Sequence, residues 1–187
     1  KKEGEELFQA VYNGHVMPSM RTLMTAGKAL DRDNMAGFNC SYIAIDHPLA
    51  FSELMYILLC GTGVGFSIEK KYTDKLPEVA EELKPSRVTI LVADSKLGWC
   101  ESMRELIALL YSGNIPSWDV SKVRPAGAPL KTFGGRASGP APLVNLMQYT
   151  VETFKKAAGR KLTTLECHDL VCKIAEVIVV GGVRRSA

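Results

Sequence analysis

The stretch FNCSYIAIDHPLAFSELMYILLCGTGVGFSIE, residues 38–69, decides the fold class. Residues 38–45 are rich in β-branched and aromatic side chains, which predicts a strand. Residues 46–60 carry apolar side chains at helical spacing behind Asp46, a residue type that favours a helix N-cap, and they predict a helix. The glycine-rich segment 61–69 runs into another strand. A strand, a helix and a strand in this order favour an α/β fold with parallel strands.

The rest of the chain continues this alternation. Further strands are expected at 87–93, within 117–127 and at 177–180. Helices are expected at 4–13, 98–114, 142–160 and 163–178, the last of which opens with Thr163 and Glu166 at capping-box spacing. Loops rich in Pro and Gly are expected at 17–38, with about one helical turn, and at 128–142. A charged elaboration between two core strands is expected at 70–117. About five strands, several of them solidly apolar, predict a parallel sheet buried on both faces.

Composition is that of an ordinary globular protein. The 187 residues, 47% of them hydrophobic and 23% charged, suit one large domain or a piece of a larger one. The net charge of +3 is too small to favour binding to nucleic acid or to a membrane surface. No apolar run reaches the roughly 18–20 residues of a membrane span, and the opening segment KKEGEELFQA lacks the apolar stretch of a signal peptide. We therefore expect a cytoplasmic protein.

The five cysteines do not suggest a disulfide scaffold, because their number is odd and their spacing is irregular. Cys167, His168 and Cys172 raise the alternative of a metal site. Helical periodicity and the adjacency of Cys167 and His168 argue instead for buried thiols on a helix, so no metal is expected.

Four loops next to strands concentrate glycine, serine, threonine and arginine, at 17–22, 60–65, 121–138 and 181–186. Small residues let backbone N–H groups approach phosphate oxygens, and hydroxyl and guanidinium groups add donors, so these loops suit anionic ligands. GTGVG alone is weak evidence, because it lacks the Rossmann and P-loop patterns and is explained equally well by structural glycines in a tight turn. Cys40 lies in a strand near this segment, and the residues alone leave open whether its thiol is reactive or inert.

Five stretches follow one another between residue 17 and residue 187: MPSMRTLMTAG, NCSY, CGTGVGFS, VRPAGAPLKTFGGRASGP and VVGGVRRSA. Together they resemble the large catalytic chain of ribonucleotide reductases, and within that family the adenosylcobalamin-dependent class II enzymes of the monomeric ribonucleoside-triphosphate type. The resemblance implies that residues 17–187 form the first five-stranded parallel half of a ten-stranded α/β barrel. Residues 1–16 would then end a helical N-terminal region, and 70–117 would be an insertion.

The resemblance also implies roles for individual residues. Cys40 matches one member of the redox-active cysteine pair, which becomes a disulfide as the 2′-hydroxyl of the substrate leaves as water. The substrate contacts match Pro18 and Ser19 for the phosphates, Asn39 and Ser41 beside the cysteine, and Thr62 and Gly63 for the nucleotide. The effector contacts match Ser121, Lys122, Val123 and Arg124 in a first loop, and Gly181, Gly182, Val183, Arg184, Arg185 and Ser186 in a specificity loop. Asp46 lies near a position that contacts the ribose of the effector, although its spacing from the cysteine is one residue shorter here.

Several parts of such an enzyme have no counterpart in the sequence. The thiyl-radical cysteine, the second redox cysteine and the C-terminal cysteines are missing, and Cys167 and Cys172 precede the specificity loop, so they do not replace them. Adenosylcobalamin contacts are expected mostly outside the chain. The implied partners are a ribonucleoside triphosphate, a deoxynucleotide effector, the C-terminal half of the reductase and a thioredoxin-type reductant.

The sequence is therefore expected to be part of a ribonucleotide reductase and to be inactive alone. The alternative is a non-catalytic nucleotide-binding chain that works only when complemented by a separate catalytic half. A truncation, a split gene and an intein-interrupted chain stay open, as do diphosphate and triphosphate substrates.

Overall fold

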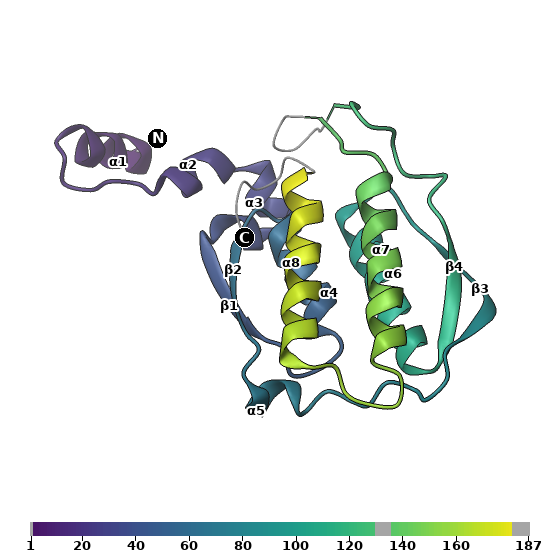
Figure 1. Ribbon diagram of the computed structural model, residues 1–187. Helices are drawn as coiled ribbons and strands as arrows, with labels where there is room; N and C mark the ends of the chain where they lie inside the picture. The colour runs from purple at the N-terminus through teal and green to yellow at the C-terminus, as the bar shows by residue number, and fades with distance from the viewer. Residues whose placement is uncertain (1, 130–135, 181–187) are drawn as a thin grey trace. The chain divides into compact units, whose positions relative to one another are not determined.

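The computed structural model describes residues 2–129 and 136–180 (Figure 1). The chain divides into two compact units, residues 1–39 and 40–187. The smaller unit contains α1 (Lys2–Tyr12), α2 (Met20–Thr25), α3 (Lys28–Arg32) and the 3-10 helix η1 (Asn34–Gly37). Helix α1 confirms the helix expected at 4–13. The loop with one helical turn expected at 17–38 contains more helix than predicted, because good helix formers dominate two short runs there, which Gly27 separates with a φ of +89°.

The larger unit opens with the predicted strand, helix and strand. Strands β1 (Cys40–Ala44) and β2 (Gly63–Ser67) pair in parallel, and α4 (Ala50–Leu59) connects them. The N-cap of α4 is Leu49, so the assignment of Asp46 as N-cap is wrong. The helix begins later because a turn precedes it, closed by a hydrogen bond of 3.1 Å from the Ala50 amide to the His47 carbonyl oxygen.

A second parallel pair follows the short helix α5 (Lys70–Thr73). Strands β3 (Lys84–Leu91) and β4 (Asn114–Asp119) are joined by α6 (Lys96–Tyr111). These elements overlap the strands and the helix expected in this region. Gly113 ends α6 with a φ of +79°, and a Cβ at this position would lie 2.8 Å from the Glu82 carbonyl oxygen. A glycine is therefore required where the chain turns from α6 into β4.

Two long helices, α7 (Ala141–Lys156) and α8 (Thr164–Val180), complete the unit. The strand expected at 177–180 is wrong, because these residues continue α8. Val177 and Ile178 are buried on the same helix as Leu170 and Ile174. Packing of this helical apolar face overrides the β-propensity of the VIVV run.

The described residues form two two-stranded sheets. Figure 1 shows β1 and β2 on one side of the larger unit and β3 and β4 on the other, with α4, α6, α7 and α8 between them. Helices α4 and α7 each pack against α6 and α8. The interior consists of their apolar side chains, including Phe51, Leu54, Met103, Leu106, Leu146, Phe154, Leu170 and Ile174. The α/β class is confirmed, whereas a five-stranded sheet is not seen among the described residues. In the same part of the chain, no helix is long and apolar enough to cross a membrane.

The capping box of α8 is confirmed and predicts a pH dependence of stability. Glu166 accepts hydrogen bonds from the Thr163 amide at 2.9 Å and from the Arg160 guanidinium at 2.7 Å. The pairing with Arg160, more than that with Thr163, lowers the pKa of Glu166 from 4.5 to about 2. A carboxylate whose pKa is lowered by folding stabilises the fold above its ordinary pKa, and this contribution disappears as the pH falls toward the folded pKa.

The free energy of unfolding of the wild type should therefore exceed that of Glu166→Gln at neutral pH, and the difference should shrink between pH 4.5 and about 2. Urea unfolding at a series of pH values measures this difference. The matched control is Glu176→Gln, which removes an exposed pair with Lys173 in the same helix. The same pH dependence in both variants would contradict the role given to the capping box.

Candidate functional site

Cys40 and the glycine-rich loop lie together at the amino ends of β1 and β2. The strands pair in register from their first residues, Cys40 opposite Gly63, and the Ser41 hydroxyl donates a hydrogen bond of 3.0 Å to the Gly63 carbonyl oxygen. The Cys40 thiol is exposed, while Thr62 and Gly63 are buried. The structure thus brings together four of the residues predicted for substrate binding and reduction: Cys40, Ser41, Thr62 and Gly63.

The loop at 61–63 is also the C-terminal cap of α4. Gly61 has a φ of +81°, and its amide donates to the Leu58 carbonyl oxygen at 2.8 Å. The Thr62 amide donates to the Ile57 carbonyl oxygen at 3.3 Å. These bonds satisfy carbonyl groups that would otherwise be unpaired at the helix end. The structural interpretation of the glycines therefore holds for Gly61.

The other residues predicted near the substrate belong to the unit 1–39. Pro18 is half-buried and Ser19 exposed, just before α2 in the unit 1–39, and the Ser19 carbonyl oxygen accepts a hydrogen bond from the Leu23 amide at 3.0 Å. Asn39 is exposed and is the last residue of that unit. Their predicted roles stay predictions.

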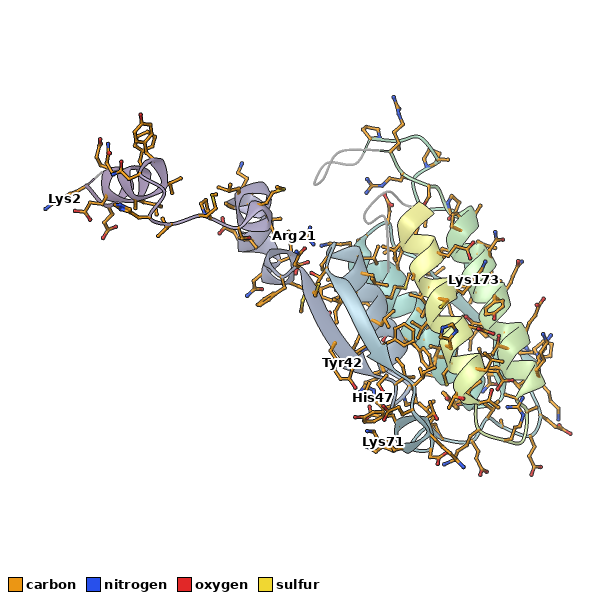
Figure 2. The ribbon with its side chains drawn as sticks, turned by 60° about the vertical axis from the view of Figure 1, so that its left-hand side comes forward. Lys2, Arg21, Tyr42, His47, Lys71 and Lys173 are labelled. Atoms are coloured by element: carbon orange, nitrogen blue, oxygen red, sulfur yellow. The ribbon has the colours of Figure 1, made fainter. Side chains whose placement is uncertain are left out.

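Asp46 lies just beyond the carboxyl end of β1. It pairs with Lys75 at 3.4 Å and lies 3.8 Å from His47. Figure 2 shows His47 on the same side of the larger unit as Tyr42 and Lys71. The surroundings of Asp46 are thus two basic side chains on one flank of the β1–β2 sheet.

A cavity of about 150 Å³ lies at the carboxyl ends of β3 and β4. Asp94, Ser95 and Lys96 follow β3, and the segment 121–124 follows β4. Carboxyl ends of neighbouring parallel strands are where α/β folds commonly bind ligands. The cavity is lined by Leu59, Asp94, Ser95, Lys96, Trp99, Val123, Arg124, Ala137, Ser138, Gly139, Val177 and Ile178.

The cavity combines an apolar wall with a charged rim. The Nε atom of Arg124 donates to both carboxylate oxygens of Asp94, at 2.9 and 3.0 Å, and each side chain is about one third exposed. The Ser95 hydroxyl accepts a hydrogen bond from the Gly98 amide at 2.9 Å and so caps α6. The positive end of this helix, Lys96 and Arg124 favour an anion, while Trp99 offers a ring on which a planar group can stack.

Residues 127–128 pair with Ala137 through backbone hydrogen bonds. The Gly127 amide donates to the Ala137 carbonyl oxygen and the Ala137 amide donates to the Ala128 carbonyl oxygen, both at 2.8 Å. Gly139 has a φ of +75°, and a Cβ there would lie 2.9 Å from the Ala126 nitrogen atom. Close backbone approach therefore requires glycine at this point of the cavity wall.

Two of the four residues predicted for the first effector loop line the cavity, Val123 and Arg124. Ser121 and Lys122 are exposed and are not among its lining residues. The Ser121 amide donates to the Asp119 carboxylate at 2.8 Å, which lowers the pKa of Asp119 and closes the turn after β4. The predicted loop at Gly181, Gly182, Val183, Arg184, Arg185 and Ser186 lies outside the described residues.

Sequence reasoning missed Asp94, Ser95, Lys96 and Trp99. The carboxylate beside Arg124 is Asp94, whereas Asp46 does not line this cavity. The signal was available, because Asp94 follows a predicted strand in the same way that the effector loop follows the next one. Ligands bind near the carboxyl ends of neighbouring parallel strands, so the residues that follow both strands are expected to line one site.

The two cysteines of α8 differ in their exposure. Cys167 is buried, as predicted, but Cys172 is exposed, so the prediction of a buried thiol is wrong there. Cys172 lies one helical turn from His168, with its sulfur 3.7 Å from Nε2, and both face away from the helical core. Partial burial and the nearby Asp169 raise the pKa of Cys172. Within 2–129 and 136–180, no group of three His, Cys, Asp or Glu side chains is placed to hold a metal ion.

The family model and the relatives that match this chain all concern the same class of enzymes. Residues 68–153 match the family model described as B12-dependent ribonucleotide reductase, insertion domain. The chain is 28% identical to the adenosylcobalamin-dependent ribonucleoside-triphosphate reductase of Euglena gracilis, over 100% of this chain and 27% of that protein. It is 27% identical to the enzyme of the same name from Lactobacillus helveticus (strain DPC 4571), over 99% of this chain and 33% of that protein.

The fold has a counterpart among solved structures. A crystal structure of a B-12 dependent (class II) ribonucleotide reductase matches with a TM-score of 0.84 and 24% identity, over 98% of this chain and 33% of that chain. The chain spans about a third or less of the length of these relatives. The resemblance that the motifs carry is therefore confirmed, for the part of the relatives that this chain covers.

Proposed function

We propose that this chain, which is similar over its whole length to adenosylcobalamin-dependent ribonucleoside-triphosphate reductases, is the part of such an enzyme that holds one reducing thiol and the effector pocket. The observation that carries the proposal is the pairing of the exposed Cys40 with Gly63 in register, beside the buried Thr62. A thiol at this position lies next to any ligand that the glycine-rich loop binds.

The chemistry assigned to Cys40 is a two-electron reduction. Two thiols lose one hydrogen each and form a disulfide, and the 2′-hydroxyl of the ribonucleotide leaves as water while hydrogen takes its place. Cys40 supplies one thiol, and the second comes from outside this chain. A dithiol of the thioredoxin type then reduces the disulfide by exchange, which needs an exposed sulfur such as that of Cys40.

The loop at 61–63 is assigned to the substrate. Its backbone is held rigidly by the end of α4, so its groups are already oriented when a nucleotide arrives. Pro18, Ser19 and Asn39 are assigned to the same substrate from the unit 1–39, with the phosphates held by the first two.

The cavity beside Arg124 is assigned to a deoxynucleotide effector. A nucleotide combines a planar base with phosphates, and the cavity combines Trp99 and apolar walls with Arg124, Lys96 and the positive end of α6. The Asp94 carboxylate, already in contact with Arg124, is suited to accept a hydrogen bond from the 3′-hydroxyl of the deoxyribose. Ser121, Lys122 and Gly181 to Ser186 are assigned to the surroundings of this pocket.

The two sheets are assigned to two parts of the enzyme. We assign β1 and β2 to the first half of a parallel barrel spanning 17–187. Strands β3 and β4 lie inside the range 68–153 that matches the insertion domain, so we assign them to the insertion. Residues 1–16 are assigned to the end of a helical region before the barrel.

Adenosylcobalamin supplies the radical chemistry of such enzymes when it is bound. The described residues contain no group of three His, Cys, Asp or Glu side chains placed to hold a metal ion, and the cavity beside Arg124 is already assigned to the effector. We therefore assign no residue of this chain to the cofactor and place its contacts in the remaining part of the enzyme.

The test is reconstitution. This chain is combined with a polypeptide that supplies the remaining two thirds of a reductase, adenosylcobalamin, a dithiol and a ribonucleoside triphosphate, and deoxynucleotide is measured. Product is the expected result. Nucleotide binding without product would overturn the catalytic assignment and favour the non-catalytic nucleotide-binding chain.

Replacing Arg124 with methionine should weaken binding of a deoxynucleoside triphosphate by about 10- to 100-fold, because a hydrogen bond to a charged group contributes about 1.5–3 kcal/mol. Equilibrium binding followed by the fluorescence of Trp99, which lines the cavity, measures the effect. The matched control is Lys122→Met, which removes an equal charge from the same loop outside the cavity and should change the affinity by less than about threefold. Equal losses in both variants would mean that the loop acts only through its net charge.

A further inference from the structure

The effector pocket and the substrate loop share one short piece of chain, the end of α4. Leu59 is the last residue of the helix and lines the cavity. Cys60 caps the helix and is completely buried. The next three residues are the loop at 61–63. A displacement of the helix end therefore moves both the wall of the effector pocket and the loop at 61–63.

Lys96 reaches from the cavity to this helix end. Its side chain lines the cavity, and its Nζ atom donates to the Cys60 sulfur at 3.6 Å. An ammonium group has three donors and lies at the end of a four-carbon stem with several rotatable bonds. An anion entering the cavity competes with the Cys60 sulfur for these donors, and a phosphate is the stronger acceptor.

The link from Cys60 to Cys40 consists of short contacts. The Cys60 amide donates to the Tyr56 carbonyl oxygen at 3.0 Å, and the Gly61 amide donates to Leu58 at 2.8 Å. Gly63 then opens β2 opposite Cys40, and Ser41 holds the Gly63 carbonyl oxygen at 3.0 Å. Only Gly61 and Thr62 lie in sequence between Cys60, whose sulfur Lys96 contacts, and the first residue of β2.

We propose that the Lys96–Cys60 contact couples occupancy of the effector pocket to the substrate loop, with Cys60 as a positioning residue. This inference rests on the proposed function. Phosphate in the cavity draws the Lys96 ammonium away from the Cys60 sulfur, and the helix end and the loop at 61–63 adjust together. Because coupling between two sites is reciprocal, substrate and effector change each other's affinity by the same factor.

The test is the coupling factor, measured in the reductase assembly that contains this chain. The dissociation constant of a deoxynucleoside triphosphate is determined with and without a saturating ribonucleoside triphosphate. In the wild type the two values should differ by about 5-fold or more, as is usual for allosteric sites. In Cys60→Ala they should agree within about twofold, while the affinity for the effector alone stays within about threefold of the wild type, because Cys60 does not line the cavity.

Two further variants separate the contact from packing. Cys60→Ser keeps an acceptor for Lys96 and should retain most of the coupling, whereas Cys60→Val fills the volume without an acceptor and should lose it. Cys167→Ala removes another completely buried thiol of the same core and should leave the coupling factor unchanged.

The outcomes distinguish this inference from the proposed function. Unchanged coupling in Cys60→Ala, or equal losses in Cys60→Ser and Cys60→Val, would overturn the inference and leave the effector pocket intact. A wild-type assembly that binds no deoxynucleotide, or binds it equally well after Arg124→Met, would overturn the proposed function and the inference with it.

Discussion

Replacing Cys40 with serine is expected to lower sustained formation of deoxynucleotide by roughly a thousandfold or more, because a hydroxyl group cannot form a disulfide with the second thiol. The effect should appear in kcat, since Cys40 is exposed at the start of β1 and does not line the effector cavity. The measurement is multiple turnover of the reconstituted assembly with excess dithiol. Effector affinity should stay within about twofold of the wild type.

The matched control is Cys172→Ser. Cys172 is the other exposed cysteine, so this variant removes an accessible thiol from the outer face of α8 without touching β1. Turnover close to the wild-type value is expected. Equal loss in both variants would indicate a general need for surface thiols, and undiminished turnover of Cys40→Ser would remove Cys40 from the chemistry.

Replacing Phe154 with alanine is expected to lower the free energy of unfolding by about 3–5 kcal/mol, a large share of the total stability of a domain. Phe154 is completely buried on α7, and its ring meets that of Tyr111 edge to face, with centroids 5.0 Å apart and an interplanar angle of 81°. The loss combines the transfer of the ring to water with the cavity left between α6 and α7. Denaturant unfolding of the purified chain measures it.

Tyr111→Phe is the matched control at the same contact. The Tyr111 hydroxyl is buried and has no hydrogen-bond partner among the described residues, and this burial raises its pKa. Removing the oxygen keeps the ring pair and relieves an unsatisfied polar atom, so stability should stay equal or rise. A loss comparable to that of Phe154→Ala would show that the hydroxyl is paired, which would contradict this view of the core.

The local pattern was sufficient to predict most of the elements. Residues 38–69 form the predicted strand, helix and strand, although the helix begins at Ala50 and not behind Asp46, because strand propensity, helical spacing and glycine position agree there. The pattern was misleading at 177–180, where a β-branched run continues a helix because the buried positions of α8 need apolar side chains. Such a run looks the same whether it packs as a strand or as a helix, and only the neighbouring helices decide between them.

The local sequence pattern does not determine which strands pair with each other. Parallel strands with apolar residues on both faces suggested one sheet, but helices α4, α6, α7 and α8 lie between two separate pairs. Which strands pair depends on the packing of these helices, and no single segment contains that information.

In the candidate site, too, the sequence predicts some of the residues and not others. Cys40, Ser41, Thr62 and Gly63 were expected together, and the register of β1 and β2 brings them together. Lys96 was not expected, because its role depends on a contact with Cys60 across two helices. A residue that acts through a distant partner has no local signal in a single sequence.

Two cysteines are exposed and three are buried, and burial protects the buried thiols from disulfide exchange. Cys60, Cys100 and Cys167 are buried, and burial raises the pKa of Cys100 and of Cys167 to about 12. Disulfide exchange requires a thiolate that can reach the sulfur it attacks, so thiols that are both protonated and enclosed take no part in it. On the proposed function, a disulfide formed at Cys40 is therefore reduced by a dithiol from solution, and the buried thiols of Cys60, Cys100 and Cys167 take no part in the exchange.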